Sequence, residues 1–450
     1  MNHHTTDVVL VGAGVAGLTC ADRLSRQGFD VLVCEARDRV GGRTSSVLAG
    51  GEVVDLGGQF VGPGQDRVYA LAAELGVEVV PTHTAGDNLV ETDAGRLRRF
   101  RGTVPSLGPL ALLDLAQAQA RFERLARRVD PRAPWTSPGA ARLDMSTLAG
   151  WIRRNLRTRM GRRLFTLASR VLWAADPSEL SLLHALFYVR AAGSLGAVMA
   201  IEGGAQQDRL VGGAQELAVR LAARLGDRVR LRAAVRAISQ DDDGVLVSVD
   251  SGVTIRAHHA VVAVPPPLAA RIEYSPPLPA LRDALTQRLG MGAAIKCMVV
   301  YPEPFWRSAG LSGYSLSLGG PLDGFVDTSA LTSERGVLAG VVAGATARTF
   351  AVRSVDERRT AVLAQLTRLL GPRAAEPIGY ADQDWSAEPF SRGAYSALFP
   401  PGAWTGFGAA LREPVGRVHW AGSEIAICWY GFIEGAIRSG EAVAAKIAGG

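Results

Sequence analysis

Asp7-Val-Val-Leu-Val-Gly-Ala-Gly-Val-Ala-Gly-Leu-Thr19 is the stretch of this 450-residue chain that decides the fold. Val8–Val11 is an apolar run of the kind that forms a buried strand. Three glycines follow in a G-x-G-x-x-G frame, namely Gly12, Gly14 and Gly17. The first permits a tight turn, the second lets a pyrophosphate approach the backbone, and the third lets the next helix pack closely. We expect that helix over Val15–Gln27, with its N-terminus facing phosphates.

A second strand is predicted over Val31–Cys34, and Glu35 ends it. This acid lies at about the right distance to accept a hydrogen bond from a ribose 2′-hydroxyl. A glycine frame alone is a weak signal. Strand, glycines, helix, strand and acid in this order predict a dinucleotide-binding unit.

Composition narrows the class of protein. The chain is 48% hydrophobic and 20% charged, as in a globular protein long enough for two domains. The net charge is +6, but the basic residues are spread out and are not interleaved with aromatics, so we expect no nucleic-acid partner. No apolar run approaches 18 residues, so no membrane span is expected.

Cysteine usage and the N-terminus bear on location. The four cysteines are widely spaced along the chain, at Cys20, Cys34, Cys297 and Cys428. They form no metal-type cluster, so we expect no metal site. A strand that starts by residue 8 leaves no room for a cleavable signal peptide. A cytoplasmic location is therefore expected.

Lysine is nearly absent. Of 49 basic residues only Lys296 and Lys446 are lysines. Lys296 lies in an apolar strand pattern, Ala294–Val300, where an ammonium must be paired, hydrated or functional. A strand-edge lysine that reaches solvent is the alternative. The preference for arginine elsewhere favours a requirement for a compact ammonium.

The middle of the chain reads as helices followed by strands. Helices are expected between residues 107 and 191, the last opening at Pro177 with Ser178 as its cap. Antiparallel strands are expected at Val229–Ile238, Val245–Val249 and His259–Val264, with a hairpin turn at Asp241–Gly244. Near the C-terminus, a strand at Val418–Ala421 and a helix at Gly431–Ile447 are predicted, in the same order as the strand and helix at the start of the chain.

The predicted fold class is therefore α/β. A Rossmann-type unit of the glutathione-reductase kind is assembled from residues 1–83, 205–293 and 388–450. Residues 84–204 and 294–387 form an inserted α+β substrate-binding domain.

Several further motifs carry a family resemblance. They include Glu35–Thr44 (EARDRVGGRT), Asp55–Gly58 (DLGG), Gln206–Gly213 (QQDRLVGG), Tyr395–Gly402 (YSALFPPG) and Trp420–Gly435 (WAGSEIAICWYGFIEG). Together with the N-terminal frame, the chain resembles the flavin-containing amine oxidases, which include monoamine, putrescine and cyclohexylamine oxidases. The resemblance runs nearly end to end and implies FAD.

On that resemblance, FAD-contacting positions are carried over residue by residue. Gly42 and Arg43 are placed by the phosphates and ring, and Val235 by the adenine. The full set is Gly12, Gly14, Val15, Ala16, Gly17, Glu35, Ala36, Arg37, Gly42, Arg43, Gly57, Gly58, Gln59, Val235, Gly422, Ser423, Glu424, Gly431, Phe432 and Ile433.

The resemblance also implies catalytic and substrate-binding residues. Lys296 would hold a water near flavin N5 and favour the reaction with O₂. Tyr395 and Phe432 would be the two aromatic walls beside the amine, although a tyrosine is common at the second position. Substrate contacts are also assigned to Gln206, Trp429 and Tyr430. Trp429 has core packing as an alternative, and Tyr430 is expected to point towards the pocket.

The implied reaction is transfer of a hydride equivalent from the amine Cα to FAD. The imine then hydrolyses to an aldehyde or ketone, and O₂ is reduced to H₂O₂. Ala394 stands where the mitochondrial enzymes carry the flavin-linking cysteine, so FAD is expected to be non-covalent. An L-amino-acid oxidase, a secondary-metabolism oxidase or desaturase, and an inactive flavoprotein remain alternatives. The expected partners are a small-molecule amine and O₂, with a homodimer left open.

Overall fold

The predicted opening unit is present. β1 (His3–Val11), α1 (Val15–Ser25) and β2 (Val31–Cys34) follow one another, and β1 pairs in parallel with β2. This computed structural model describes residues 3–92, 95–102, 105, 108–330 and 333–449. Side chains of β1 alternate between two cores, because Val8 and Leu10 pack among helices while Val9 and Val11 pack among strands.

The first sheet has eight strands in the order β10-β2-β1-β13-β12-β11-β14, with β22 beside β13. β1 pairs in parallel with β13, and β11, β12 and β13 form an antiparallel meander. Their bounds are β10 (Val229–Arg230), β11 (Val235–Gln240), β12 (Val245–Val249), β13 (Thr254–Val262), β14 (Glu273–Ser275) and β22 (Val418–Trp420). The first sheet thus joins segments from the start, middle and end of the chain.

The single strand predicted at Val229–Ile238 is wrong, because the segment is two strands, β10 and β11. Between them Arg232 has a φ of 54°, and its N–H donates to the Arg37 carbonyl at 2.9 Å. The N–H of Ala233 donates to the Glu35 carbonyl at 2.8 Å. The chain turns here to follow the end of β2 rather than continue its own strand. The hairpin turn at Asp241–Gly244 is confirmed.

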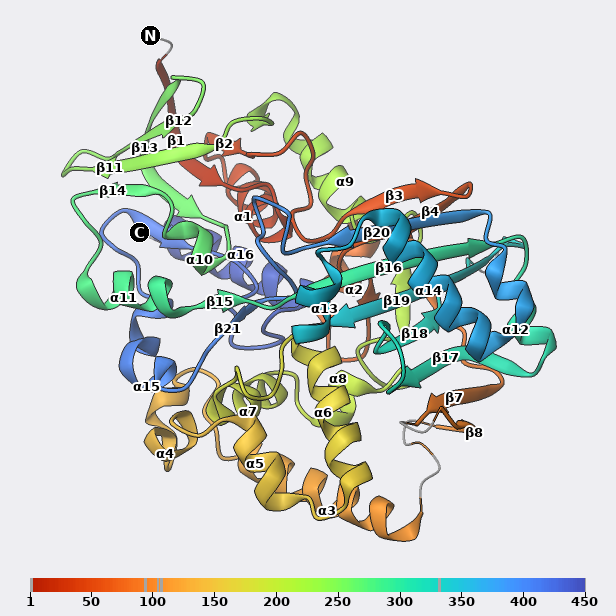
Figure 1. Ribbon diagram of the computed structural model, residues 1–450. Coiled ribbons are helices and arrows are strands. Elements are labelled where there is room, and N and C mark those ends of the chain that lie inside the picture. Colours follow the sequence, from red (N-terminus) through yellow and green to blue (C-terminus); the bar gives the residue numbers. More distant parts are fainter. Residues whose placement is uncertain (1–2, 93–94, 103–104, 106–107, 331–332, 450) are drawn as a thin grey trace.

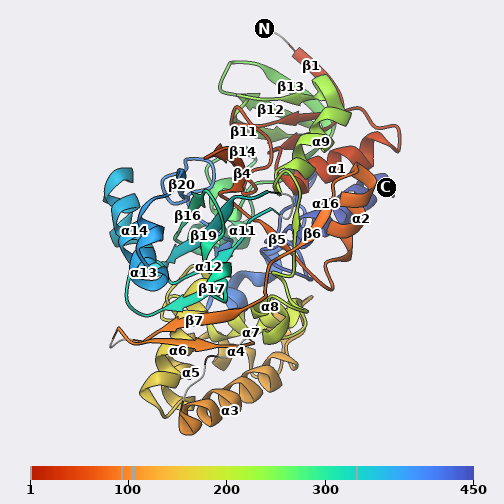
Figure 2. The ribbon, with the colours of Figure 1, turned by 90° about the vertical axis from the view of Figure 1, so that its right-hand side faces the viewer.

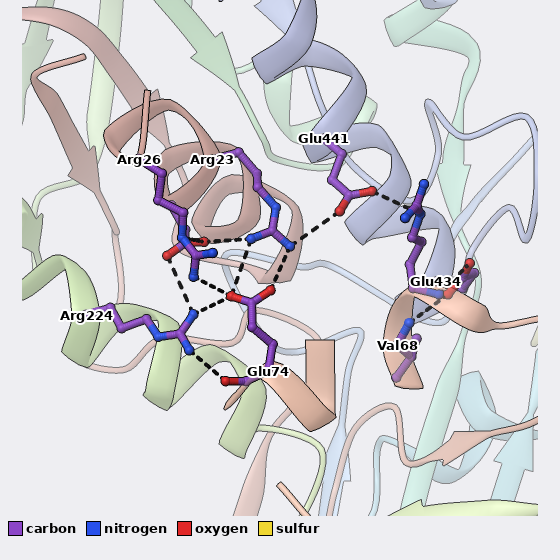
Figure 3. Close-up of polar contacts among 9 residues, drawn as sticks. Arg23, Arg26, Val68, Glu74, Arg224, Glu434 and Glu441 are labelled. Carbon is purple, nitrogen blue, oxygen red and sulfur yellow. Dashed lines mark hydrogen bonds and ion pairs between the residues drawn. The ribbon is translucent and has the colours of Figure 1, made fainter. Parts of the chain in front are cut away.

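Four helices cover one face of the first sheet, and charged side chains tie them together (Figure 3). Glu74 in α2 (Asp66–Leu75) contacts Arg23 of α1, Arg26 directly after α1, and Arg224 of α9 (Glu216–Leu225). Although burial opposes the shift, these guanidinium groups lower the pKa of Glu74 to about 2. The last helix, α16 (Ile433–Ala448), joins through Glu434, which accepts from the Val68 N–H at 2.9 Å.

The second sheet has seven strands in the order β20-β16-β19-β18-β17-β7-β8. Ile295, Cys297 and Val299 of β16 pack in one core with α14 (Val355–Leu370), whereas Met298 and Val300 pack with Val54 on the other face. Lys296 shares that second face by alternation. The bounds are β7 (Asp87–Glu91), β8 (Leu97–Phe100), β16 (Ala294–Tyr301), β17 (Leu311–Ser317), β18 (Gly324–Asp327), β19 (Gly336–Ala343) and β20 (Gly379–Asp384).

A helical layer lies at the end of the molecule opposite β1 and β12 (Figures 1 and 2). The helix predicted to end near Ala191 is present, but its predicted start at Pro177 with Ser178 as its cap is wrong. Residues 177–179 form a turn, and the helix begins at Leu182 because Ser181 accepts from the His184 N–H. The layer contains α3 (Pro109–Ala126), α4 (Ala140–Asp144), α5 (Leu148–Asn155), α6 (Arg159–Trp173), α7 (Leu182–Ala191) and α8 (Leu195–Met199).

Short elements connect these layers. They are β3 (Ser46–Ala49), β4 (Glu52–Asp55), β5 (Phe60–Val61), β6 (Val79–Pro81), β9 (Asp208–Leu210), β15 (Gly290–Met291), β21 (Ala397–Leu398), α10 (Pro266–Ala269), α11 (Ala280–Arg288), α12 (Phe305–Ser308), α13 (Gly344–Phe350) and α15 (Ala403–Phe407). Among the described residues no helix is long and apolar enough to cross a membrane. The α/β class, with a Rossmann-type unit and a second domain, is confirmed.

Candidate active site

A cavity of about 690 Å³ joins the glycine turn after β1 to the second sheet. Most of the residues predicted to bind cofactor or substrate line it. They are Gly12, Gly14, Val15, Ala16, Glu35, Ala36, Arg37, Gly42, Arg43, Gly57, Gly58, Gln59, Gln206, Val235, Lys296, Tyr395, Gly422, Ser423, Gly431, Phe432 and Ile433. Four predicted residues do not line it: Gly17, Glu424, Trp429 and Tyr430.

The glycine turn has the form that a phosphate-binding turn requires. Gly12 has a φ of +104°, a conformation that L side chains rarely adopt. A Cβ added to Gly14 would meet no atom within 4 Å, so the space before α1 is open to a ligand. A Cβ on Gly17 would lie 2.1 Å from the Gly12 carbonyl oxygen. Gly17 therefore serves helix packing rather than direct contact with a cofactor.

Glu35 lies at the end of β2 with its carboxylate at the cavity. Its Oε2 accepts from the Ala13 N–H at 2.7 Å, and its Oε1 accepts from the Arg37 N–H at 2.9 Å. These bonds aim a buried carboxylate across the glycine turn. The open turn and this oriented acid fit a dinucleotide cofactor.

Glu424 does not line the cavity but lies behind Arg43, and its contact with the cofactor stays a prediction. Arg43 donates to Glu424 Oε1 at 2.6 Å and to Oε2 at 2.8 Å in a bidentate pair. Burial would raise the pKa of Glu424, but Arg43 holds it below its ordinary value. Arg43 also donates to the Tyr395 carbonyl at 2.7 Å. Glu424 therefore positions Arg43, which links the first glycine segments to Tyr395.

The Lys296 ammonium lies within the cavity wall. Its Nζ donates to the Gly57 carbonyl at 2.8 Å and to Gln59 Oε1 at 2.7 Å. Burial lowers the pKa of Lys296 to about 8, and the nearby Asp55 carboxyl partly opposes the shift. The alternative of a lysine reaching bulk solvent does not describe this geometry. The side chain is held among polar atoms at the glycine segment 57–58.

Aromatic side chains form another part of the cavity wall. Tyr395 and Phe432 both line it, as predicted, and the Phe432 ring packs on Tyr188 with centroids 5.7 Å apart. Trp429 and Tyr430 do not line the cavity, and their assignment to the substrate stays a prediction. Trp429 Nε1 donates to the Gly64 carbonyl at 2.8 Å, and the Tyr430 hydroxyl donates to the Ala397 carbonyl at 2.7 Å. Both rings are anchored in the core behind Phe432.

Sequence reasoning missed much of the wall opposite the glycines. Tyr188 lies on α7, a helix buried on nearly every side, so no periodicity distinguishes its cavity face. Gln206 lines the cavity as expected, and its Nε2 donates to the Val198 carbonyl at 3.1 Å. Val171 and Leu172 of α6, for which core and cavity were equally expected, line the cavity, whereas Trp173 does not. The other missed side chains are apolar or aromatic residues from the 198–201 segment, the second sheet and the position after β20: Val198, Met199, Ile201, Tyr314, Leu316, Phe325, Val341 and Trp385.

Comparisons with known proteins agree with this geometry. A family model described as flavin containing amine oxidoreductase matches residues 15–448. The putative flavin-containing monoamine oxidase AofH of Mycobacterium tuberculosis is 44% identical over 444 residues, which are 99% of this chain and 97% of that protein. An L-amino acid dehydrogenase of Synechocystis is 40% identical over 455 residues, with 98% and 95% covered. The structure of a putrescine oxidase bound to putrescine superposes with a TM-score of 0.96 at 33% identity, over 100% of both chains.

Proposed function

Because the chain belongs to the family of flavin-containing amine oxidoreductases, we propose that it oxidises an apolar monoamine with non-covalently bound FAD and O₂. The observation that carries this proposal is the cavity, which joins a dinucleotide-type glycine turn to an apolar wall with one ammonium, Lys296. FAD, when bound, supplies the acceptor for a hydride equivalent from the amine. The steps below concern what the chain's own residues do.

The part of the cavity wall formed by α6, α7, the 198–206 segment and the second sheet, here called the substrate wall, favours an apolar substrate molecule. In the part of the chain that the structure describes, the residues of this wall that line the cavity carry a single charged group, Lys296. A diamine would bring a second ammonium with no carboxylate to receive it. An amino acid would bring a carboxylate with no guanidinium there to clamp it. Burial of an unpaired charge is costly, so a monoamine fits best.

The aromatic rings favour the neutral amine. The rings of Tyr395, Phe432 and Tyr188 line the cavity, and Phe432 packs on Tyr188. Such surroundings lower the pKa of an ammonium, because the charged form loses its hydration. The neutral amine has the lone pair that assists removal of hydrogen from Cα. No side chain has to act as a general base in this proposal.

Non-covalent attachment of FAD is supported by the side chains near Tyr395. Ala394 lines the cavity there and has no group that could form a bond to a flavin. The cysteine that lines the cavity is Cys34, at the end of β2 beside Glu35, where burial raises the pKa of its thiol to about 12. We therefore assign cofactor retention to the glycine turn, Glu35 and the Arg43 region.

Lys296 is proposed to assist O₂ reduction. Its ammonium is held by Gly57 and Gln59, and it supplies a fixed positive charge in a buried site. Such a preorganised charge stabilises negative charge that develops as O₂ accepts electrons. The product on the oxygen side would be H₂O₂.

The decisive experiment measures peroxide release from the purified holoenzyme with matched panels of monoamines, diamines and L-amino acids. We expect turnover with apolar monoamines and weak turnover with diamines. No peroxide with any amine, despite bound flavin, would contradict the proposal. Acid precipitation of the same sample should release all flavin into the supernatant. Yellow protein in the pellet would contradict non-covalent binding.

L-amino-acid oxidation is the second candidate. Its support is the 40% identity to the Synechocystis L-amino acid dehydrogenase. The missing guanidinium on the substrate wall weighs against it. Peroxide release, or reduction of an added electron acceptor, with L-amino acids alone would favour this candidate.

We also propose domain boundaries and a cellular location. Strands of the first sheet fall within residues 1–83, 205–293 and 388–450, and strands of the second fall within 84–204 and 294–387. This division supports a discontinuous FAD-binding domain and a substrate-binding domain. The four cysteines are free, which suits a reducing cytoplasm.

A further inference from the structure

An ion pair lies directly behind the substrate wall, where the end of α6 meets the second sheet (Figure 1). Arg170 of α6 donates from Nη2 to Asp323 Oδ1 at 2.5 Å. Asp323 lies between β17 and β18, and its side chain is only 3% exposed. Neither residue lines the cavity, but several of their sequence neighbours do, namely Ala168, Val171, Leu172, Gly324 and Phe325.

The Asp323 carboxylate is fixed in this place from two sides. Its Oδ2 accepts from the Ala343 N–H of β19 at 2.9 Å, while Arg170 holds Oδ1. Its own N–H donates to the carbonyl of Val341, which lines the cavity, at 2.9 Å. Turning the carboxylate away from β19 would break both side-chain contacts. The negative charge therefore stays next to the wall.

The charge of Asp323 acts on a ring that lines the cavity. Burial raises the pKa of the Tyr395 hydroxyl, and the Asp323 carboxylate raises it further. Burial also raises the pKa of Asp323 itself to about 6, and the Arg170 guanidinium opposes this shift. A charge in a low-dielectric interior is screened much less than a charge in water. An ionised Asp323 is therefore felt inside the cavity unless a cation compensates it.

The other carboxylate near Asp323 has partners of its own. Asp176, which follows α6, raises the pKa of Asp323. Its Oδ2 accepts from the Ala345 N–H at 2.8 Å and lies 3.5 Å from the Arg348 guanidinium. Among the described residues, Arg170 is the cation that pairs with Asp323.

We propose that Arg170 is a specificity-determining residue, which neutralises Asp323 and so keeps this carboxylate from attracting the second ammonium of a diamine to the substrate wall. The inference rests on the proposed function, the oxidation of an apolar monoamine. An uncompensated buried carboxylate attracts an ammonium strongly, whereas the two charges of a close ion pair largely cancel at a distance. Neither residue touches the substrate, because both act through their charge.

A double-mutant cycle in the purified holoenzyme tests this role. The quantity measured is the ratio of kcat/KM for a straight-chain diamine to that for the monoamine of the same chain length. Arg170→Met leaves a carboxylate unpaired and should raise the ratio by about tenfold, and Asp323→Asn leaves a guanidinium unpaired and should lower it. The two substitutions together should return the ratio close to the wild-type value.

A purely mechanical role, in which the pair only holds α6 on the sheet, predicts a different pattern. Loss of either partner would then move the ratio in the same direction, and that result would overturn the proposal. Arg256→Gln, which alters an exposed arginine paired with Asp241, is the matched control and should leave the ratio unchanged.

The pH profile gives a second signature of charge. Without its cation, Asp323 should have a pKa above the wild-type value of about 6, because burial is no longer opposed by Arg170. The ratio in Arg170→Met should therefore rise with pH as this carboxyl ionises. The double variant lacks the carboxyl and corrects for titration of the amines themselves. Identical profiles in these two variants would overturn the proposal.

Two further comparisons keep the test decisive. If Arg170→Met does not fold, Asp323→Asn and Arg170→Lys carry it, because Lys keeps the charge and should keep the wild-type ratio. A raised or unchanged ratio in Asp323→Asn would then count against the proposal. No peroxide from the wild-type enzyme with any amine would contradict the proposed function. Wild-type turnover with the same ratio in every variant would contradict only the role of Arg170.

Discussion

The two walls of the cavity are built in different ways. The cofactor wall uses backbone and short motifs, with Gly12, Gly14 and Glu35 inside 24 consecutive residues of the sequence. The substrate wall uses side chains from α6, α7, the 198–206 segment and the second sheet, which come together only in the fold. In the proposed function, the first wall recognises a fixed chemical group through geometry, whereas the second selects by shape and by its lack of a carboxylate or guanidinium among the described residues.

The largest expected effect separates two glycines of the first wall. Gly17→Ala would place a Cβ 2.1 Å from the Gly12 carbonyl oxygen, so it should cost about 3 kcal/mol of unfolding free energy. Gly14→Ala finds open space and should preserve the fold while weakening flavin binding. Denaturant unfolding and flavin titration measure both. Equal stability losses would break the distinction between packing and cofactor contact.

The next effect concerns the one charge on the substrate wall. Lys296→Met should slow flavin reoxidation by on the order of 10²-fold, because a preorganised positive charge is lost. Flavin reduction should change much less. Since the pKa of Lys296 is about 8, wild-type reoxidation should slow as the pH rises through that value.

Stopped-flow measurement of the two half-reactions tests this role. Lys296→Arg keeps a charge but not the compact ammonium, so an intermediate rate is expected. Oxidative rates unchanged in Lys296→Met would remove the proposed role of this residue.

A smaller effect tests selection by the apolar wall. Phe325→Glu would place a carboxylate on the cavity face of β18, so the ratio of kcat/KM for a diamine to that for a monoamine should rise by about tenfold. Phe325→Gln has a similar size without the charge and serves as the control. The same ratio in both variants would show that charge is not what this wall excludes.

The smallest effect concerns Glu74, in the helices that cover the first sheet. Glu74→Gln should cost about 0.5–1 kcal/mol of unfolding free energy, because Glu74 is partly exposed and its ion pairs are screened. Its folded pKa of about 2 lies below the ordinary 4.5. The stabilisation is therefore present above about pH 4.5 and is lost as the pH falls towards 2.

Unfolding midpoints across this pH range provide the measurement. Glu441→Gln, whose carboxylate contacts Arg23 at 3.5 Å and Arg67 at 3.3 Å, should cost less. A loss of catalytic rate in Glu74→Gln at neutral pH would break the separation between this helix network and the two cavity walls.

Much of the fold was predictable where local signals agree. The strand at Ala294–Tyr301 and the helices at Val15–Ser25 and Ile433–Ala448 follow the predicted pattern, because the alternation or the helical periodicity is strong there. The predictions were wrong where contacts with a segment distant in the sequence determine the path of the backbone. Residues 231–234 leave their strand to bond the chain after β2, a partner that lies almost 200 residues away.

The candidate site shows the same limit. Tyr430 occupies a motif position beside Phe432, yet its hydroxyl bonds the Ala397 carbonyl and its ring packs in the core. Trp429 and Tyr430 therefore could not be separated from Phe432 by spacing. Helices α6 and α7 are apolar on faces that meet core and faces that meet the cavity, so hydrophobicity alone did not distinguish Tyr188 from Trp173.

The sequence by itself determined the cofactor end of this protein, because a turn that must approach phosphates needs glycines at set spacings. It also identified Lys296 as a candidate functional residue, because an ammonium in an apolar strand of an arginine-rich chain must be paired, hydrated or functional. Only the tertiary structure decided which hydrophobic residues face the cavity and which pack in the core. Those properties depend on which distant side chains meet, and short-range spacing does not encode that.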